Sequence, residues 1–261
     1  MPRRGSLLPE LTIAVAHYQY QDLTRDCIAS INTQEIPCTY EKLLVDNGSD
    51  IPIDAPPSWR LFRSGSNIGN IGSQNLCFEQ AQGEWVLFVA NDVRLYDLEC
   101  IRELWRFKEW WQKGLSIGQI QPMVQTATCQ VDQLGMEWRW PGYGISRKRN
   151  TSIPAIQIVP STCFLMKKDT WSRMEGFDEQ LQSSHEDVDM GLRLLKKGYT
   201  NLLCSEAEVV HLGNATLQHT LSNHRQVFHQ ARLKVIRKHY RWADYWTRYL
   251  AIQLLDHLPR P

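Results

Sequence analysis

The sequence contains no CxxC pair of cysteines, which argues against a structural zinc site and against a disulfide-bonded scaffold. Its seven cysteines are odd in number and widely spaced, so we expect reduced thiols in a cytoplasmic protein. No run approaches the ~18–20 apolar residues of a membrane-spanning helix, and the apolar stretch near the start is too short for a signal peptide. These absences predict a soluble protein, or one that contacts a membrane only peripherally.

Two nucleotide-binding signatures are also missing. The chain has no GxxxxGK[ST], which excludes a P-loop, and residues 66–75 (SNIGNIGSQN) match GxGxxG too poorly to support a dinucleotide-binding fold. These Gly and Asn residues nevertheless lead into a predicted helix, whose first backbone N–H groups can meet an anion. Internal repeats and low-complexity tracts are absent, so we predict a single domain for the 261 residues.

An excess of charge is lacking as well, and the net charge of +1 indicates no class of partner. The last part of the chain differs, because residues 221–261 carry Arg and Lys at eight positions against Asp244 and Asp256, with aromatic residues interleaved. Such a segment can bind nucleic acid through phosphate contacts and base stacking. It can also lie on anionic lipid or form an ordinary solvated face, and the sequence leaves these interpretations open.

Strands and helices alternate in the first 125 residues. Strands are predicted at 11–16, 41–46, 59–64, 84–90 and 117–125, and helices at 21–34, 71–83 and 97–113. A loop or hairpin insertion is predicted over 126–160, a strand at 161–171, a helix from His185, one or two short strands over 201–213, and helices over 220–257. Apolar strands in this arrangement predict an α/β fold with a mostly parallel sheet covered on both faces.

Polar residues follow several of these strands. Ligands of such sheets bind beyond the carboxyl ends of the strands, where Asp46 and Asp92 stand. Both are also common turn formers. His211 follows the apolar run 207–210 and is either structural or a metal ligand. Combined with a strand-end aspartate, it would suit Mn²⁺ or Mg²⁺ with a substrate phosphate completing the coordination.

The predicted helix over 185–198 begins with acidic residues. Helical spacing places Asp187 on the apolar face, Glu186 and Asp189 on other faces, and Asp189 one turn before Arg193, with which it can pair. Acids at a helix start are stabilised by the macrodipole alone. The alternative is a general base held beside a cleft.

The order of these motifs is more specific than any one of them. The segments VDNGSD (45–50), NIGNIGSQN to ANDV (67–93), GFDE (176–179), HEDVDMGLRLLKKGY (185–199) and AEVVHLG (207–213) together resemble family 2 glycosyltransferases of GT-A fold, in particular the rhamnosyltransferase-like branch. The resemblance covers roughly 11–240. It implies one GT-A domain with a nucleotide-binding half (11–125), an acceptor and catalytic half (126–215) and a basic helical extension (216–261).

The resemblance also implies an activity, which is inverting transfer of a sugar from a nucleotide-diphosphate sugar such as a UDP-sugar to an acceptor hydroxyl, with Mn²⁺ or Mg²⁺. By position, Asp187 with Glu186 beside it would be the catalytic base, and Asp92 and His211 would bind the metal. The donor would be held by Ala16, His17, Tyr18, Asp46, Asn67, Asn75 and Asn91. The acceptor is left open between a glycan, a lipid-linked glycan and a nucleic acid.

One position departs from the family pattern. Relatives place Asp or Asn where this chain has Ala90, so the triplet reads Ala90-Asn91-Asp92. The alanine side chain can contact neither ribose nor metal, and Asn91 would have to substitute by a shift of one residue. This departure motivates a competing hypothesis, a protein that binds nucleotide or sugar without turnover.

Overall fold

A mixed ten-stranded sheet runs through the computed structural model, which describes residues 8–109, 113–147, 154–182, 184–213 and 224–256. The strand order is β10-β12-β6-β11-β4-β1-β2-β3, with β5 paired to β12 and β7 to β6. The strands are β1 (Leu11–His17), β2 (Tyr40–Asp46), β3 (Arg60–Arg63), β4 (Trp85–Ala90), β5 (Val93–Arg94), β6 (Ile117–Thr126), β7 (Val131–Gln133), β10 (Ala155–Ile156), β11 (Cys163–Lys167) and β12 (Thr200–His211). A separate hairpin joins β8 (Met136–Arg139) to β9 (Tyr143–Ser146).

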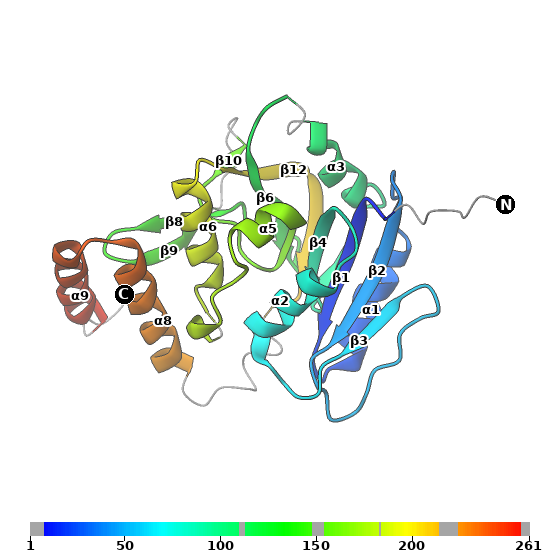
Figure 1. Ribbon diagram of the computed structural model, residues 1–261, viewed down its shortest axis with the longest axis horizontal. Coiled ribbons are helices and arrows are strands. Elements are labelled where there is room, and N and C mark those ends of the chain that lie inside the picture. The colour runs from blue at the N-terminus through cyan, green and yellow to red at the C-terminus, as the bar shows by residue number, and fades with distance from the viewer. Residues whose placement is uncertain (1–7, 110–112, 148–153, 183, 214–223, 257–261) are drawn as a thin grey trace.

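Helices cover both faces of this sheet (Figure 1). They are α1 (Gln21–Asn32), α2 (Gly69–Gln80), α3 (Cys100–Arg106), α5 (Lys168–Arg173), α6 (Glu186–Lys196), α8 (His224–His239) and α9 (Trp242–Asp256), with a 3₁₀ turn η1 (Glu179–Leu181). One apolar core lies between the sheet and α1 and α3. The other lies between the sheet and α2, α5, α6 and α8. The predicted fold class, a mostly parallel sheet flanked by helices with a helical C-terminal extension, is confirmed.

Strands β1, β2, β3 and β4 run parallel, and their registers pair His17 with Asp46 and Ala16 with Ala90. β1, β4 and most of β2 are buried on both faces, and each fully buried Leu, Ile, Val or Phe side chain contributes roughly 1.5–3 kcal/mol. Because these strands are parallel, their carboxyl ends meet at one edge of the sheet. The polar residues that follow them are therefore brought together there.

Two more strands bring residues to the same edge. β11 is antiparallel to β4 with Cys163 opposite Val89, so residues 161–162 lie beside the end of β4. β12 ends at His211, which pairs with Val93 of β5, and the amide of Leu212 donates to the carbonyl of Asp92 at 2.9 Å. The sheet itself thus places His211 next to Asp92.

Three element predictions differ from the structure. A strand is predicted at 161–171, but β11 ends at Lys167. Lys167 pairs with Trp85, the first residue of β4, so β4 offers no further residue to pair with and the chain continues as α5. Over 201–213 we expect one or two short strands, and the structure has one long strand, β12, with two register shifts against β6. The helix expected over 97–113 is shorter, since α3 ends at Arg106, and residues 110–112 of that prediction lie outside the described part of the chain.

The C-terminal helices α8 and α9 form a pair at the end of the molecule beside the β8–β9 hairpin (Figure 1). Ala231, Val235 and Ile236 of α8 and Ile252 of α9 are buried in the core that includes α6. Over the described residues, no helix combines the length and the apolar character that crossing a membrane requires.

Candidate active site

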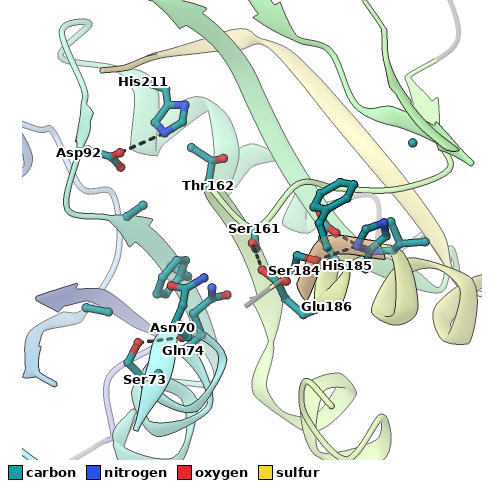
Figure 2. Close-up of a pocket in the computed structure, with 18 of the residues that line it drawn as sticks. Asn70, Ser73, Gln74, Asp92, Ser161, Thr162, Ser184, His185, Glu186 and His211 are labelled. Atoms are coloured by element: carbon teal, nitrogen blue, oxygen red, sulfur yellow. Dashed lines mark hydrogen bonds and ion pairs between the residues drawn. The ribbon is translucent and has the colours of Figure 1, made fainter. Parts of the chain in front are cut away.

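A cavity of about 640 Å³ opens at the carboxyl ends of β1 and β4, between the sheet, α2, the start of α6 and α8. Figure 2 shows part of its lining. Two pairs of chemically active residues face it. Asp92 and His211 form one pair, and Glu186 and Asp187 at the start of α6 form the other.

The Asp92–His211 pair is held by backbone pairing of β12 with the segment after β4. His211 Nε2 lies 3.2 Å from Asp92 Oδ2, and His211 Nδ1 lies 3.9 Å from Asp132 Oδ2. Burial by itself lowers the pKa of His211, but Asp92 and Asp132 outweigh that effect and raise it. The imidazole therefore lies between two carboxylates, one of which shares the cavity with it.

This pair fits a divalent cation that is shared with a substrate. A carboxylate and an imidazole are suitable ligands for Mn²⁺, and a carboxylate also for Mg²⁺. Within the described ranges, His, Cys, Asp and Glu form no group of three or more that would hold a metal ion without help. Asp92 and His211 would therefore supply part of the coordination, and the open cavity leaves the rest to phosphate and water.

The start of α6 supplies the second pair. Ser161 donates a hydrogen bond from Oγ to Glu186 Oε1 at 2.7 Å, and the amide of Val188 donates to Asp187 Oδ1 at 2.7 Å. Burial raises the pKa of both carboxyl groups, and the charge of Glu186 raises that of Asp187 further. Such a pair binds a proton more readily than exposed carboxylates do, which suits a general base.

Helical spacing gives the side chains of Glu186 and Asp187 different directions, and the family resemblance implies that the two stand side by side in the site. Glu186 and Asp187 both line the cavity. They are the first two residues of α6, and the helix begins at the cavity wall, so both side chains lie beside the same space. The predicted Asp189–Arg193 pair is present, with Asp189 Oδ2 2.8 Å from Arg193 Nε.

His185 precedes this pair in the left-handed conformation, with φ of 64°. Its ring centroid lies 4.3 Å from that of Phe228 and 5.8 Å from that of Trp138. Burial, with the nearby positive charge of Arg232, lowers the pKa of His185 to about 4. The imidazole is therefore neutral near pH 7 and forms part of an aromatic wall.

A comparison with known protein families agrees with the fold and the motifs. The sequence profile described as "Glycosyl transferase family 2" matches residues 12–172, more than half of the chain. The chain belongs to glycosyl transferase family 2. The resemblance drawn from the motifs is thereby confirmed.

Named relatives of this family 2 chain agree. It is 27% identical over 233 residues to O-antigen biosynthesis protein RfbC of Myxococcus xanthus, across 82% of this chain but only 18% of that protein. It is 25% identical over 223 residues to N-acetylglucosaminyl-diphospho-decaprenol L-rhamnosyltransferase of Mycobacterium tuberculosis, across 71% of this chain and 72% of that one. The crystal structure of GalNAc-T7 with UDP, GalNAc and Mn²⁺ superposes with a TM-score of 0.74 at 13% identity, over 98% of this chain and 52% of that one. At this identity the likeness shows the shared GT-A fold.

Five of the residues expected at the donor site of this family 2 chain line the cavity, namely Ala16, His17, Tyr18, Asn67 and Asn91. His17 Nδ1 lies 2.6 Å from the hydroxyl of Thr24, which also accepts from the amide nitrogen of Asn91 at 3.2 Å. Burial lowers the pKa of His17. Thr24 thus joins the segments after β1 and β4 beneath the cavity.

Asp46 and Asn75, also expected at the donor site, lie outside the cavity lining. Asp46 Oδ1 accepts from the amide of Ser49 at 3.0 Å and its Oδ2 lies 3.4 Å from Arg63. The side chain of Asn75 donates to the carbonyl of Phe177 at 3.0 Å and accepts from the amide of Phe177 at 2.9 Å. In this structure both side chains fix segments around the cavity.

The departure at Ala90 is visible in the same lining. Ala90 is half-buried at the end of β4, and its amide donates to the carbonyl of Thr162 at 2.9 Å. Asn91 turns its amide nitrogen toward Thr24. Within the triplet, Asp92 is therefore the residue that brings a carboxylate to the cavity.

Several lining residues have no counterpart in the sequence-based expectations. Arg232 of α8 is buried, with its guanidinium carbon 4.8 Å from the ring centroid of Tyr143 on β9. A helical position among Ala231, Val235 and Ile236 is the one local sign that this arginine faces inward. Other lining residues without such an expectation include Asn47, Asn70, Ser73, Gln74, Gln133, Ser161, Thr162, His185 and Phe228.

Proposed function

We propose that this chain is an inverting glycosyltransferase that moves a sugar from a nucleotide-diphosphate sugar to an acceptor hydroxyl. The observation that carries the proposal is one cavity at the carboxyl ends of parallel strands with a carboxylate–imidazole pair in its walls and a second carboxylate pair, of which Glu186 is buried and Asp187 partly buried. The first pair suits a bound diphosphate with its cation. The second suits removal of a proton.

The donor side would lie along the ends of β1 and β4. Ala16, His17 and Tyr18 would border the nucleoside, with Asn67 and Asn91 shaping the space around it. Asp92 and His211 would hold Mn²⁺ or Mg²⁺ against the diphosphate. The bound cation would neutralise the charge that develops on the departing nucleoside diphosphate. The Mn²⁺ and UDP in the GalNAc-T7 structure support this choice of ligand class.

Asp187 is the proposed base. It takes the proton of the acceptor hydroxyl as that oxygen bonds to the anomeric carbon, and the bond from that carbon to the donor phosphate oxygen breaks on the opposite side. Glu186, held by Ser161, stands beside it and makes the pair more basic. The raised pKa of Asp187 improves proton transfer from a hydroxyl near neutral pH.

For the acceptor we propose a glycan, and specifically one linked to a lipid. A relative of comparable length is named for a diphospho-decaprenol acceptor. The nucleic-acid alternative draws on the basic tail, but part of that charge is used inside the fold. Lys234 donates to the carbonyl of Gln180, and Lys238 lies 2.7 Å from Asp178 and 3.0 Å from Asp189.

We further propose a cytoplasmic protein with a donor half over 11–125, an acceptor half over 126–215 and the extension over 216–261. The free cysteines among the described residues support a reducing compartment. The hypothesis of binding without turnover draws only on Ala90. Asp92, Asp187 and His211, all in the cavity wall, support turnover instead.

A calorimetric titration with UDP, GDP and dTDP, with and without Mn²⁺, tests the donor site. We expect one nucleotide to bind, Mn²⁺ to tighten it, and Asp92→Ala to abolish that gain. Incubation of a matching nucleotide sugar with lipid-linked glycans then tests turnover against Asp187→Asn. Absence of nucleotide binding under all metal conditions would overturn the proposal.

A further inference from the structure

Helix α9 carries an exposed apolar face. Trp242, Trp246 and Leu250 follow one another at four-residue spacing and so lie on one side of the helix. They are 77%, 43% and 59% exposed, and the rings of Trp242 and Trp246 contact each other with centroids 6.2 Å apart. Large apolar side chains that are exposed together in this way indicate a surface that binds a partner or a membrane.

A third exposed tryptophan stands in the neighbouring hairpin. Trp140, in the turn between β8 and β9, is 62% exposed. The turn is attached to α9 because Arg248 Nη1 donates to the carbonyl of Pro141 at 3.2 Å. Figure 1 shows the hairpin beside α8 and α9 at the same end of the molecule. We call Trp242, Trp246 and Leu250 the tryptophan surface, and Trp140 is a further exposed tryptophan on the neighbouring hairpin.

The charge around this surface is positive. Residues 221–261 sum to +6, but Lys234 and Lys238 are paired within the fold and Arg232 is buried, so only part of this charge faces solvent. Arg237 and Arg241 are exposed on the helix pair. Tryptophan at the boundary of apolar and polar regions together with Lys and Arg is the composition of helices that lie on anionic lipid.

The neighbours of the tryptophan surface adjoin the cavity. Phe228 and Arg232 of α8 and residues 142–144 after the hairpin turn line the cavity wall. The hairpin that carries Trp140 and helix α8, which packs against α9, therefore help to enclose the cavity, whereas α9 contributes none of the lining residues.

We propose that the tryptophan surface docks on an anionic lipid bilayer, so that a lipid-linked acceptor reaches the cavity from the membrane. This rests on the proposed function for the identity of the acceptor, but the docking itself does not. A second copy of the chain is a poorer occupant, because it would bring the exposed Arg237 and Arg241 of the two copies together. Nucleic acid is poorer as well, because Lys234 and Lys238 are held by groups of the fold.

Co-flotation with vesicles tests the docking. The wild-type chain is mixed with phosphatidylcholine vesicles, with or without phosphatidylglycerol, at low salt. We expect binding to the mixed vesicles, a blue shift of tryptophan fluorescence, and release at high salt. Trp242→Ser/Trp246→Ser/Leu250→Ser, and separately Arg237→Glu/Arg241→Glu, should each weaken binding by at least about tenfold.

A matched control removes equally exposed apolar side chains elsewhere. Ile51→Ser/Tyr96→Ser/Leu98→Ser changes residues that are 71%, 69% and 51% exposed and lie outside the helix pair, and should leave vesicle binding unchanged. The proposal is overturned if wild type does not bind mixed vesicles, or if all three variants bind as wild type does. It is also overturned if the serine substitutions at 242, 246 and 250 instead abolish a dimer or DNA binding.

UDP titration with Mn²⁺ separates the two proposals. The triple variant at 242, 246 and 250 should bind UDP as wild type does, because these residues do not line the cavity. Vesicle binding without any nucleotide binding would remove the proposed function and leave the docking in place. Nucleotide binding without vesicle binding would remove the docking proposal and leave the proposed function in place.

Discussion

His239 Nε2 lies 2.7 Å from Oδ1 of Asp189, a carboxylate of α6 with no exposed surface. Arg193 Nε and Lys238 Nζ lie 2.8 and 3.0 Å from the same carboxylate. This cluster joins α6, which carries Asp187, to α8, which carries Arg232. The relative position of the proposed base and the cavity wall thus depends on one buried charge.

Replacement of that charge should be costly. We expect Asp189→Asn to lower the free energy of unfolding by about 3 kcal/mol near pH 7, since three donors lose a charged partner. Burial alone would raise the pKa of Asp189, but His239, Arg193 and Lys238 lower it overall. A lowered pKa contributes stability above the unfolded-state pKa, and that stability is lost as pH falls through the folded-state value. The difference between variant and wild type should therefore shrink in acid.

Urea unfolding at neutral and acidic pH measures this difference. Asp169→Asn is the control, because Asp169 pairs with Arg173 at the same four-residue spacing but with both side chains more than half exposed. Exposed pairs of this kind are worth at most about 1 kcal/mol. Equal losses of unfolding free energy in the two variants would show that the buried cluster contributes no more than an exposed ion pair.

Turnover should depend on Asp187. We expect Asp187→Asn to lower kcat by about 10²–10⁴ while the affinity for UDP with Mn²⁺ stays unchanged. A base acts when deprotonated, so a raised pKa should place the acidic limb of the kcat/KM profile above the ordinary range of an aspartate. The profile of wild type and calorimetry of the variant measure both. An acidic limb near pH 4, or weaker nucleotide binding, would count against this role.

Ser161 tunes the carboxyl pair through Glu186. Its hydrogen bond lowers the pKa of Glu186, so Ser161→Ala should leave Glu186 protonated over a wider range. A neutral Glu186 no longer raises the pKa of Asp187, and the acidic limb of kcat/KM should move to lower pH. Ser73→Ala is a suitable control, because that hydroxyl lines the same cavity but donates to the carbonyl of Asn70. A limb that stays in place in Ser161→Ala would rule out the coupling.

Asp132 should orient His211 for metal binding. It lies 3.9 Å from Nδ1, on the side of the ring away from Asp92. Loss of such an outer partner weakens metal affinity by about 10–100-fold. We therefore expect Asp132→Asn to weaken Mn²⁺ binding without changing metal-free nucleotide binding. Glu208→Gln, an exposed position on the same strand as His211, should change neither quantity.

Local patterns predicted the sheet and the strand-end residues, because buried parallel strands and turn residues have short-range signals. Asp92 follows the end of β4 and His211 ends β12, and the pairing of β12 with β5 brings them together. Helical spacing alone does not predict that Glu186 shares the cavity with Asp187, because it does not say which wall the first turn of a helix meets. The end of β11 was also misplaced, since it is set by its partner strand β4.

Arg232 shows what local reasoning does not reach. The other residues that line its cavity lie up to about two hundred positions earlier in the sequence. The position of Arg232 depends on the packing of α8 against α6 through Asp189 and His239. The same packing makes Lys238 an internal partner where the sequence indicates a free cation for phosphate. Charge counts of a segment describe its solvent-facing side only after such pairs are known.

Ala90 gives the sharpest test of the metal site, because a carboxylate can be added where the family pattern has Asp or Asn. Ala90 lines the cavity two residues before Asp92. We expect Ala90→Asp to tighten Mn²⁺-dependent UDP binding by about tenfold, since affinity for a hard cation rises with the number of charged oxygen ligands. Ala90→Asn is similar in size without the charge and should give a smaller gain. Calorimetry with and without Mn²⁺ measures both variants, and a gain that is the same without metal would show that residue 90 contacts the nucleotide rather than the cation.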